Sequence, residues 1–150
     1  MRVVIQRVSQ ASVVVENKLI SSIKTGYMLL VGISTEDTIA DIEKSVRKVS
    51  GLRLFPDDSN AQWKRSIKDI GGEVLSISQF TLIARTKKGT RPDFHEAQKG
   101  HLALEMYDRF LDLLRQELGE KQVQDGEFGA MMSCSLTNEG PVTIIYDTKE

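Results

Sequence analysis

The run YMLLVGI, residues 27–33, sets the architecture of this chain, because it is apolar at every position apart from the small Gly32. Gly26 precedes the run and a polar segment follows it, so the run is bounded at both ends. A short continuous apolar run of this kind is typical of a strand whose two faces are both buried. The sequence therefore predicts a sheet in which residues 27–33 form a central strand.

The segments on both sides of this run also predict strands. Residues 2–15 are rich in Val and Ile with polar residues between them, and residues 19–23 follow a turn, so these two segments predict a strand and its return strand. Strand-like composition recurs further along the chain, at residues 52–55, 73–84, 123–126, 130–136 and 142–146. Turn-forming residues at 138–141 are expected to separate the last two strands.

Two main helices are predicted between these strands. Thr38 and Asp41 fit a capping box, and apolar residues at helical spacing follow as far as Gly51. Residues 66–69 are ambiguous. A wider apolar stripe that ends at Gly119 marks the second helix, with Ala103, Met106, Tyr107, Phe110, Leu113 and Leu114.

The order of these elements predicts a single α/β domain over residues 1–150. Strands joined by long helical connections form mixed β-sheets, and two main helices packed on one face give β/β/α layers. The sequence contains no internal repeat and no interdomain linker. Because two helices leave part of the sheet uncovered, we expect another sheet or a partner subunit to cover it, which favours a homodimer.

Composition limits the possible partners. The chain has 20 Lys and Arg against 21 Asp and Glu, a net charge of −1, so it does not hold nucleic acid by overall charge. A local basic patch is still compatible with tRNA, whereas DNA and membranes are not expected as partners. No segment approaches the ~18 consecutive apolar residues of a membrane span, and the chain start lacks a secretory signal, so we expect a cytoplasmic protein. The only cysteine, Cys134, lies in an apolar run and is predicted to be a buried structural thiol.

Familiar catalytic sets are missing from this sequence. His95-Glu96 begins like a zinc-protease motif, but Lys99 stands where the second histidine is needed. Neither a glycine-rich phosphate loop nor a Gly-x-Ser-x-Gly elbow occurs, so we expect no metal and no cofactor. His95 and His101 remain candidates for a general base, although histidines at the start of a helix are more often ordinary surface residues.

Two short segments stand out instead. SQFT, residues 78–81, lies inside the predicted strand 73–84, where strand alternation places Gln79 and Thr81 on one face. The second segment is NEGPVT, residues 138–143. A half-buried strand explains the first segment and a turn explains the second, so the residue types alone do not identify a function.

Taken together, segments spread along nearly the whole chain resemble the D-aminoacyl-tRNA deacylase family, which was first described as D-tyrosyl-tRNA deacylases. Five segments carry the resemblance in the same order: MRVVIQRV at 1–8, SQFTL at 78–82, GTRPDF at 89–94, FGAMM at 128–132 and NEGPVT at 138–143. One position departs from the family pattern, because Glu139 stands where aspartate is usual.

The resemblance implies a hydrolase that cleaves the ester bond of D-aminoacyl-tRNA and of mischarged glycyl-tRNA. It implies a homodimer with active sites at the subunit interface and a cis Gly140-Pro141 peptide that reaches into the partner's site. There the carbonyl oxygens leave no space for an L side chain, so L-aminoacyl-tRNA is excluded by steric clash. Arg7 matches the arginine that orients the Gly-Pro pair, and Asn138 belongs to the same motif.

SQFT matches the opposite wall of that site, so Ser78, Gln79, Phe80 and Thr81 are the predicted catalytic residues. Thr81 corresponds to a residue suggested as a nucleophile, but no base in the motif could activate its hydroxyl. We expect attack by water instead, with the oxyanion bound by backbone amides near Phe80 and Thr81. The ribose 2′-hydroxyl of the terminal adenosine is expected to assist.

Five other residues are candidates for binding the tRNA. Met132 is expected either to line an adenine pocket or to be a core methionine, and Phe94 either to lie beside the site or to anchor its loop. Lys87, Lys88 and Arg91 form a cationic cluster suited to acceptor-stem phosphates, or else a solvated loop. The alternative function is a non-catalytic tRNA-binding or protein-binding module on the same dimeric scaffold, although such a chain is expected to lose SQFT or Gly-Pro.

Overall fold

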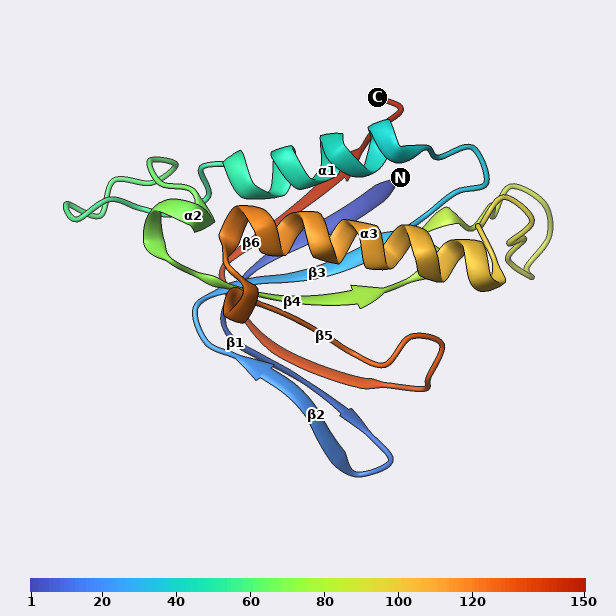
Figure 1. The fold of residues 1–150 in the computed structure, drawn as a ribbon, viewed down its shortest axis with the longest axis horizontal. Coiled ribbons are helices and arrows are strands. Elements are labelled where there is room, and N and C mark those ends of the chain that lie inside the picture. Colours follow the sequence, from blue (N-terminus) through green and yellow to red (C-terminus); the bar gives the residue numbers. More distant parts are fainter.

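A computed structural model describes residues 1–150 and contains a six-stranded mixed sheet (Figure 1). The strands are β1 (Arg2–Val15), β2 (Lys18–Ile23), β3 (Gly26–Gly32), β4 (Glu73–Ser78), β5 (Val123–Asp125) and β6 (Ser133–Asp147). They follow the order β2-β1-β3-β4-β5, and β6 also pairs with β1. β1 is antiparallel to β2, β3 and β6, whereas β3, β4 and β5 run parallel.

Strand β1 is shared between two layers of the sheet. Its residues 2–8 pair with β3 and its residues 11–15 pair with β2, while β6 accompanies both halves. The β1, β2 and β6 part of the sheet consequently folds across the face of β3 and β4 (Figure 1). Ser21 Oγ donates a 2.8 Å hydrogen bond to the Asp125 carbonyl oxygen, which joins β2 to β5 and nearly closes the sheet.

Helices α1 (Ile39–Gly51) and α3 (Gly100–Leu118) lie side by side over the opposite face of the sheet (Figure 1). The predicted capping pair of α1 is confirmed, because the Thr38 amide donates to the Asp41 carboxylate at 2.8 Å. The residues left ambiguous form a short helix, α2 (Ile67–Ile70). The apolar stripe of α3 is buried as expected at Ala103, Met106, Tyr107, Phe110 and Leu114. Leu113 is only partly buried, and Leu111, which was not predicted, is buried.

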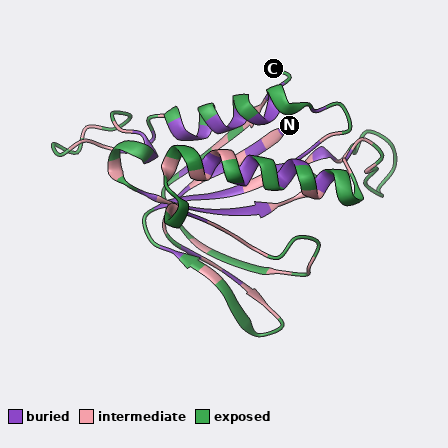
Figure 2. Ribbon diagram, in the orientation of Figure 1, coloured by how far each residue is buried: buried purple, intermediate pink, exposed green.

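Two apolar cores lie on the two faces of β3, and Figure 2 shows the buried residues concentrated there. The first core lies between the sheet and the helices and includes Tyr27 and Leu29. The second lies between the two layers of the sheet and includes Met28 and Val13. The prediction that residues 27–33 form a doubly buried central strand is therefore confirmed, as is a mixed α/β fold in β/β/α layers.

The strand predicted over residues 73–84 is wrong in its second half. β4 ends at Ser78, and a 3-10 helix, η1 (Phe80–Ile83), follows. Strand alternation therefore does not govern Gln79 and Thr81, which belong to a turn that leaves the sheet.

Gly32 explains why the chain can turn at this point. A Cβ atom at position 32 would lie 2.9 Å from the Leu82 Cβ and 3.1 Å from the Gln79 carbonyl oxygen. The Gln79 amide still donates to the Val31 carbonyl at 2.7 Å, and η1 then packs directly on the glycine backbone. The close approach needs a residue without a side chain, and it overrides the strand propensity of the segment.

The two strands predicted at 130–136 and 142–146 form one strand, β6, so residues 138–141 do not separate them. The ladder with β1 is interrupted there instead, because residues 139–142 of β6 lie opposite Arg7 alone. The turn-forming residues make a bulge within a strand, since β1 provides pairing partners on both sides of it.

Two smaller boundaries also differ from the prediction. Gly51 is the last residue of α1 rather than the residue after it. Residues 52–55 form no strand, because Phe55 makes only an isolated bridge with Arg65.

The second sheet layer covers β4 but leaves part of β6 open, where Ile145 is 69% exposed.

Candidate functional site

A cavity of about 760 Å³ opens where β4 passes into η1 and where α3 begins. All four residues of SQFT line it, and so do Phe94 and Met132. These six predicted site residues come from three separate segments, so the fold brings together what the sequence keeps apart. The walls are mostly apolar, and Lys99 is the only charged residue among them.

The SQFT segment presents its polar groups and one aromatic ring at this cavity. The Gln79 side-chain amide donates a hydrogen bond to the Thr81 hydroxyl. Phe80 is 56% exposed, and its ring meets the Phe94 ring edge to face with the centroids 5.1 Å apart. The predicted neighbourhood of Gln79 and Thr81 is present, although a 3-10 turn creates it rather than a strand face.

The backbone of η1 has free donors on the same wall. The first amides of a helix have no acceptor within that helix, and neither the Phe80 nor the Thr81 amide donates to another group of the chain. Two unpaired N–H groups at a cavity can bind an oxygen atom that carries negative charge.

The opposite wall comes from the start of α3 and from the segment before β6. Met132 lines the cavity and also packs against the second core, and its role toward an adenine stays a prediction. Cys134 contradicts the prediction of a buried thiol, because it is exposed on β6 at the cavity wall. Its cross-strand partner is the buried Val13, so the side chain lies on the inner face of the second sheet layer, where the cavity leaves it open. Partial burial of the sulfur raises the thiol pKa, which disfavours the thiolate.

The Gly140-Pro141 bulge lies outside this cavity. Its peptide bond is cis, and both residues are exposed. Arg7 Nε donates to the Glu139 carbonyl oxygen at 2.8 Å, so the arginine holds the bulge from the side of β1. Asn138 holds it from within, because its Oδ1 accepts from the Val142 amide at 2.7 Å.

The predicted cationic cluster of Lys87, Lys88 and Arg91 lies in an exposed loop that does not line the cavity. The base of the loop is closed by two backbone hydrogen bonds between Arg85 and Asp93, of 2.8 and 2.9 Å. The three cations make no ion pair within the chain, so they are free to meet anionic groups.

Neither histidine lines the cavity. His95 instead approaches Asp93, with 2.6 Å between Nδ1 and Oδ2, and hydrogen bonds from the His95 backbone and ring lower the Asp93 pKa. His101 pairs with Glu105 at 3.0 Å on the surface of α3. No three His, Cys, Asp or Glu side chains gather as metal ligands would.

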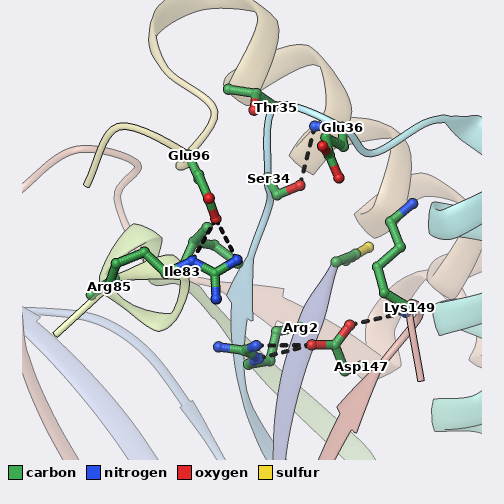
Figure 3. Close-up of a pocket in the computed structure, with 11 residues that line it drawn as sticks. Arg2, Ser34, Thr35, Glu36, Ile83, Arg85, Glu96, Asp147 and Lys149 are labelled. Carbon is green, nitrogen blue, oxygen red and sulfur yellow. Dashed lines mark hydrogen bonds and ion pairs between the residues drawn. The ribbon is translucent and has the colours of Figure 1, made fainter. Parts of the chain in front are cut away.

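A second cavity, of about 180 Å³, lies behind η1 and is shown in Figure 3. Its charged groups neutralise one another: Arg2 pairs with Asp147 at 2.9 Å, and Arg85 pairs with Glu96 at 2.7 Å. No predicted site residue lines it. The larger cavity is therefore the candidate site.

Lys99 was not predicted as a wall residue, and Phe128 to Ala130 were noted only as part of the FGAMM motif. The sequence did contain a signal for Phe128 to Ala130, because the FGAMM segment is one of the five that resemble the family. No local pattern marks Lys99, because only the direction of α3 brings it to the cavity.

No helix in the structure combines the length and the apolar character that a membrane span requires.

Comparison with known proteins agrees with this arrangement. The D-aminoacyl-tRNA deacylase of Saccharomyces cerevisiae is 66% identical over 150 residues, which span all of both chains. The D-aminoacyl-tRNA deacylase of Flavobacterium psychrophilum is 50% identical and covers 99% of this chain and 98% of its own.

Two solved structures resemble the fold throughout. One, named c-Myc DNA Unwinding Element Binding Protein, has a TM-score of 0.95 at 43% identity, with 99% of each chain covered. Another, described as a probable eukaryotic D-amino acid tRNA deacylase, has a TM-score of 0.84 at 20% identity, with 97% covered, and supports the fold alone. The profile of the family described as D-Tyr-tRNA(Tyr) deacylase matches residues 4–147. The chain therefore belongs to the D-Tyr-tRNA(Tyr) deacylase family.

Proposed function

We propose that this protein hydrolyses the ester bond between a D-amino acid and the 3′ end of tRNA, releasing free D-amino acid and tRNA. One observation carries the proposal: in a chain 66% identical throughout to a D-aminoacyl-tRNA deacylase, the whole SQFT segment lines a cavity of about 760 Å³. The cavity is mostly apolar, as small-molecule sites usually are, and has a few convergent polar groups.

The chemistry proposed for this site is direct attack by water. Water adds to the ester carbonyl carbon, and the resulting oxyanion accepts hydrogen bonds from the free amides of Phe80 and Thr81. The bond from carbon to the ribose oxygen then breaks, and that oxygen takes up the proton that the attacking water loses. The neighbouring 2′-hydroxyl of the terminal adenosine assists this transfer, because the wall has no histidine or carboxylate for it.

Exclusion of L-amino acids is assigned to the Gly140-Pro141 bulge of a partner subunit. The bulge is exposed and lies away from the cavity of its own chain, as a wall supplied to another subunit would. Rigid carbonyl oxygens there would clash with an L side chain but leave room for a D residue or for glycine. On this basis, mischarged glycyl-tRNA is also a substrate.

The homodimer is part of the same proposal. Ile145 is largely exposed on β6 and pairs with the half-buried Val4, so an apolar strip stays open on the face away from the helices. A second copy that covers this strip could bring each bulge to the other subunit's cavity. Chains of 16.8 kDa should then sediment as a species of twice that mass.

The tRNA body is assigned to the cluster of Lys87, Lys88 and Arg91, whose cations suit acceptor-stem phosphates. Met132 and the Phe80–Phe94 ring pair are assigned to the terminal adenosine, since aromatic and thioether groups at a cavity wall pack well on a base. Because its substrate would be the aminoacyl-tRNA of translation, the enzyme is assigned to the cytoplasm.

The second candidate is a non-catalytic nucleic-acid-binding or protein-binding module on the same scaffold. It is favoured by the solved structure at 43% identity, whose name is that of a DNA-element binding protein. The deciding experiment offers D-tyrosyl-tRNA and L-tyrosyl-tRNA to the purified protein at low concentration. Hydrolysis of the D ester alone supports the deacylase, whereas equal hydrolysis of both esters, or of neither, refutes it.

A further inference from the structure

The guanidinium of Arg7 is buried at the Gly140-Pro141 bulge without any carboxylate partner. Arg7 is 9% exposed, and no Asp or Glu lies within ion-pair distance of it. Three neutral oxygens accept hydrogen bonds from it in place of a carboxylate. Nε donates to the Glu139 carbonyl at 2.8 Å, and Nη1 donates to the Leu54 carbonyl at 2.6 Å and to Gln62 Oε1 at 3.1 Å. A buried cation requires such acceptors, so the loss of any one is costly.

Gln62 is the only side chain among these acceptors, and an ordered loop presents it. The Asp57 amide donates to the Ala61 carbonyl at 3.0 Å, and Asp57 Oδ1 accepts from the Ala61 amide at 3.0 Å. Beyond Gln62, the Arg65 amide donates to the Phe55 carbonyl at 2.9 Å. The loop is therefore tied on both sides of Gln62, which holds the Gln62 backbone in place for the contact of its side chain with Arg7.

The contact continues from Gln62 to the bulge through one rigid group. The guanidinium of Arg7 is planar, so an acceptor that fixes Nη1 also fixes the direction of Nε. Nε in turn holds the Glu139 carbonyl, and Nη2 would lie 3.4 Å from a Cβ atom at Gly140. Three segments that are distant in sequence thus meet at one side chain.

We propose that Gln62 is a positioning residue for the Gly140-Pro141 bulge, and that through Arg7 it sharpens the exclusion of L-amino acids. The inference rests on the proposed function, in which this bulge is the wall that an L side chain meets. Exclusion by clash depends on where the wall stands, and a displacement of about 1 Å is enough to relax it. A D-amino acid points away from the wall, so its hydrolysis is not affected.

The test compares substitutions at Gln62 with a control in the same loop. Gln62→Met keeps the length of the side chain and removes the acceptor, Gln62→Ala removes both, and Gln62→Glu keeps an acceptor oxygen. Lys64→Met is the matched control, because Lys64 is exposed two residues away and its side chain makes no hydrogen bond or ion pair. Each variant is assayed for kcat/KM on D-tyrosyl-tRNA and on L-tyrosyl-tRNA, and its Tm is recorded.

Loss of a hydrogen bond to a charged group at a partly exposed position changes an equilibrium constant by about tenfold, here the constant between the correctly placed and the displaced bulge. We expect Gln62→Met and Gln62→Ala to raise L-ester hydrolysis about tenfold and to leave D-ester hydrolysis within about twofold. Gln62→Glu and Lys64→Met should behave like the wild type.

A role in general stability alone would lower both activities together and would not create L-ester hydrolysis. An unchanged ratio of D to L activity in both acceptor-free variants, or an equal fall in both activities, overturns the proposal. If the wild-type protein hydrolyses neither ester, the proposed function itself fails. This failure can be told apart from failure of the Gln62 proposal, because it is seen in the wild type before any variant is compared.

Discussion

The Gln79 side-chain amide donates to the Thr81 hydroxyl, so the hydroxyl oxygen is engaged as an acceptor at the wall of the cavity. No histidine, lysine or carboxylate is hydrogen-bonded to Thr81 to take up its proton. A hydroxyl without a base is a weak nucleophile, so this contact supports a structural role in holding the turn rather than covalent catalysis.

Thr81→Ala should therefore retain activity within about tenfold of the wild type, since the backbone donors of η1 stay in place. Single-turnover hydrolysis of D-tyrosyl-tRNA gives the rate of the chemical step. A loss of about 10⁴-fold in a folded variant would instead identify Thr81 as a nucleophile.

Replacement of the terminal adenosine of the tRNA by 2′-deoxyadenosine should slow hydrolysis by about 10²-fold or more, because the proposed proton transfer is lost. The rate is measured with D-tyrosine esterified at the 3′-hydroxyl. The control for affinity is a competition assay, which measures how tightly the uncleaved deoxy substrate binds. Full activity on the deoxy substrate would rule out assistance by the RNA.

Gly140→Ala should destabilise the protein and weaken the rejection of L esters. Gly140 has φ +146°, and a Cβ there would lie 2.7 Å from Val142 Cγ2 and 2.8 Å from the Val142 nitrogen. We expect the free energy of unfolding to fall by about 1–3 kcal/mol in urea titrations.

Gly51→Ala is the matched control for that substitution, since a Cβ at the end of α1 would meet nothing within 4 Å. It should leave the selectivity unchanged and stabilise the protein by about 0.5–1 kcal/mol. Wild-type stability and selectivity in Gly140→Ala would contradict the role assigned to the bulge.

The carboxylate of Asp41 should make the fold less stable in acid. Burial alone would raise its pKa, but the Thr38 amide, the Thr148 hydroxyl and the Lys149 ammonium outweigh burial and hold the pKa well below its usual range. Because the folded pKa lies below the unfolded value of about 4, this contribution is present above pH ~4 and is lost as the pH falls toward the folded pKa.

The measurement is the difference in free energy of unfolding between the wild type and Asp41→Asn. It should be about 1–2 kcal/mol near neutral pH and should shrink below pH ~4. Asp108→Asn, at an exposed position on α3, should show no such pH-dependent difference. A difference for Asp41 that stays constant down to pH ~2 would contradict the assignment.

Substitution of Lys87, Lys88 and Arg91 by Gln should raise KM for D-tyrosyl-tRNA without changing kcat. Weaker binding of phosphates should also flatten the dependence of affinity on salt, by about 0.7–0.9 in log-log slope for each phosphate that is no longer neutralised. The control replaces Lys44, Arg47 and Lys121, which are equally exposed and carry the same charge. Equal effects from both triple variants would show that only overall charge matters.

The elements that local physics controls could be predicted from the amino-acid pattern. Continuous apolar character over residues 27–33 was enough to predict a strand covered on both faces, and a capping pair with an apolar stripe was enough to place each main helix. The motifs SQFT and NEGPVT indicated the family, although no residue chemistry within them revealed a reaction.

The positions of those motifs depend on how distant segments pack together. Residues after Ser78 leave the sheet because Gly32, on a neighbouring strand, admits the turn against its backbone. Gly140-Pro141 bulges within a strand because β1 pairs with β6 on both sides of Arg7. Local propensity cannot encode either result, since both depend on contacts between segments that are far apart in the chain. The cavity wall at SQFT and the exposed bulge are products of packing.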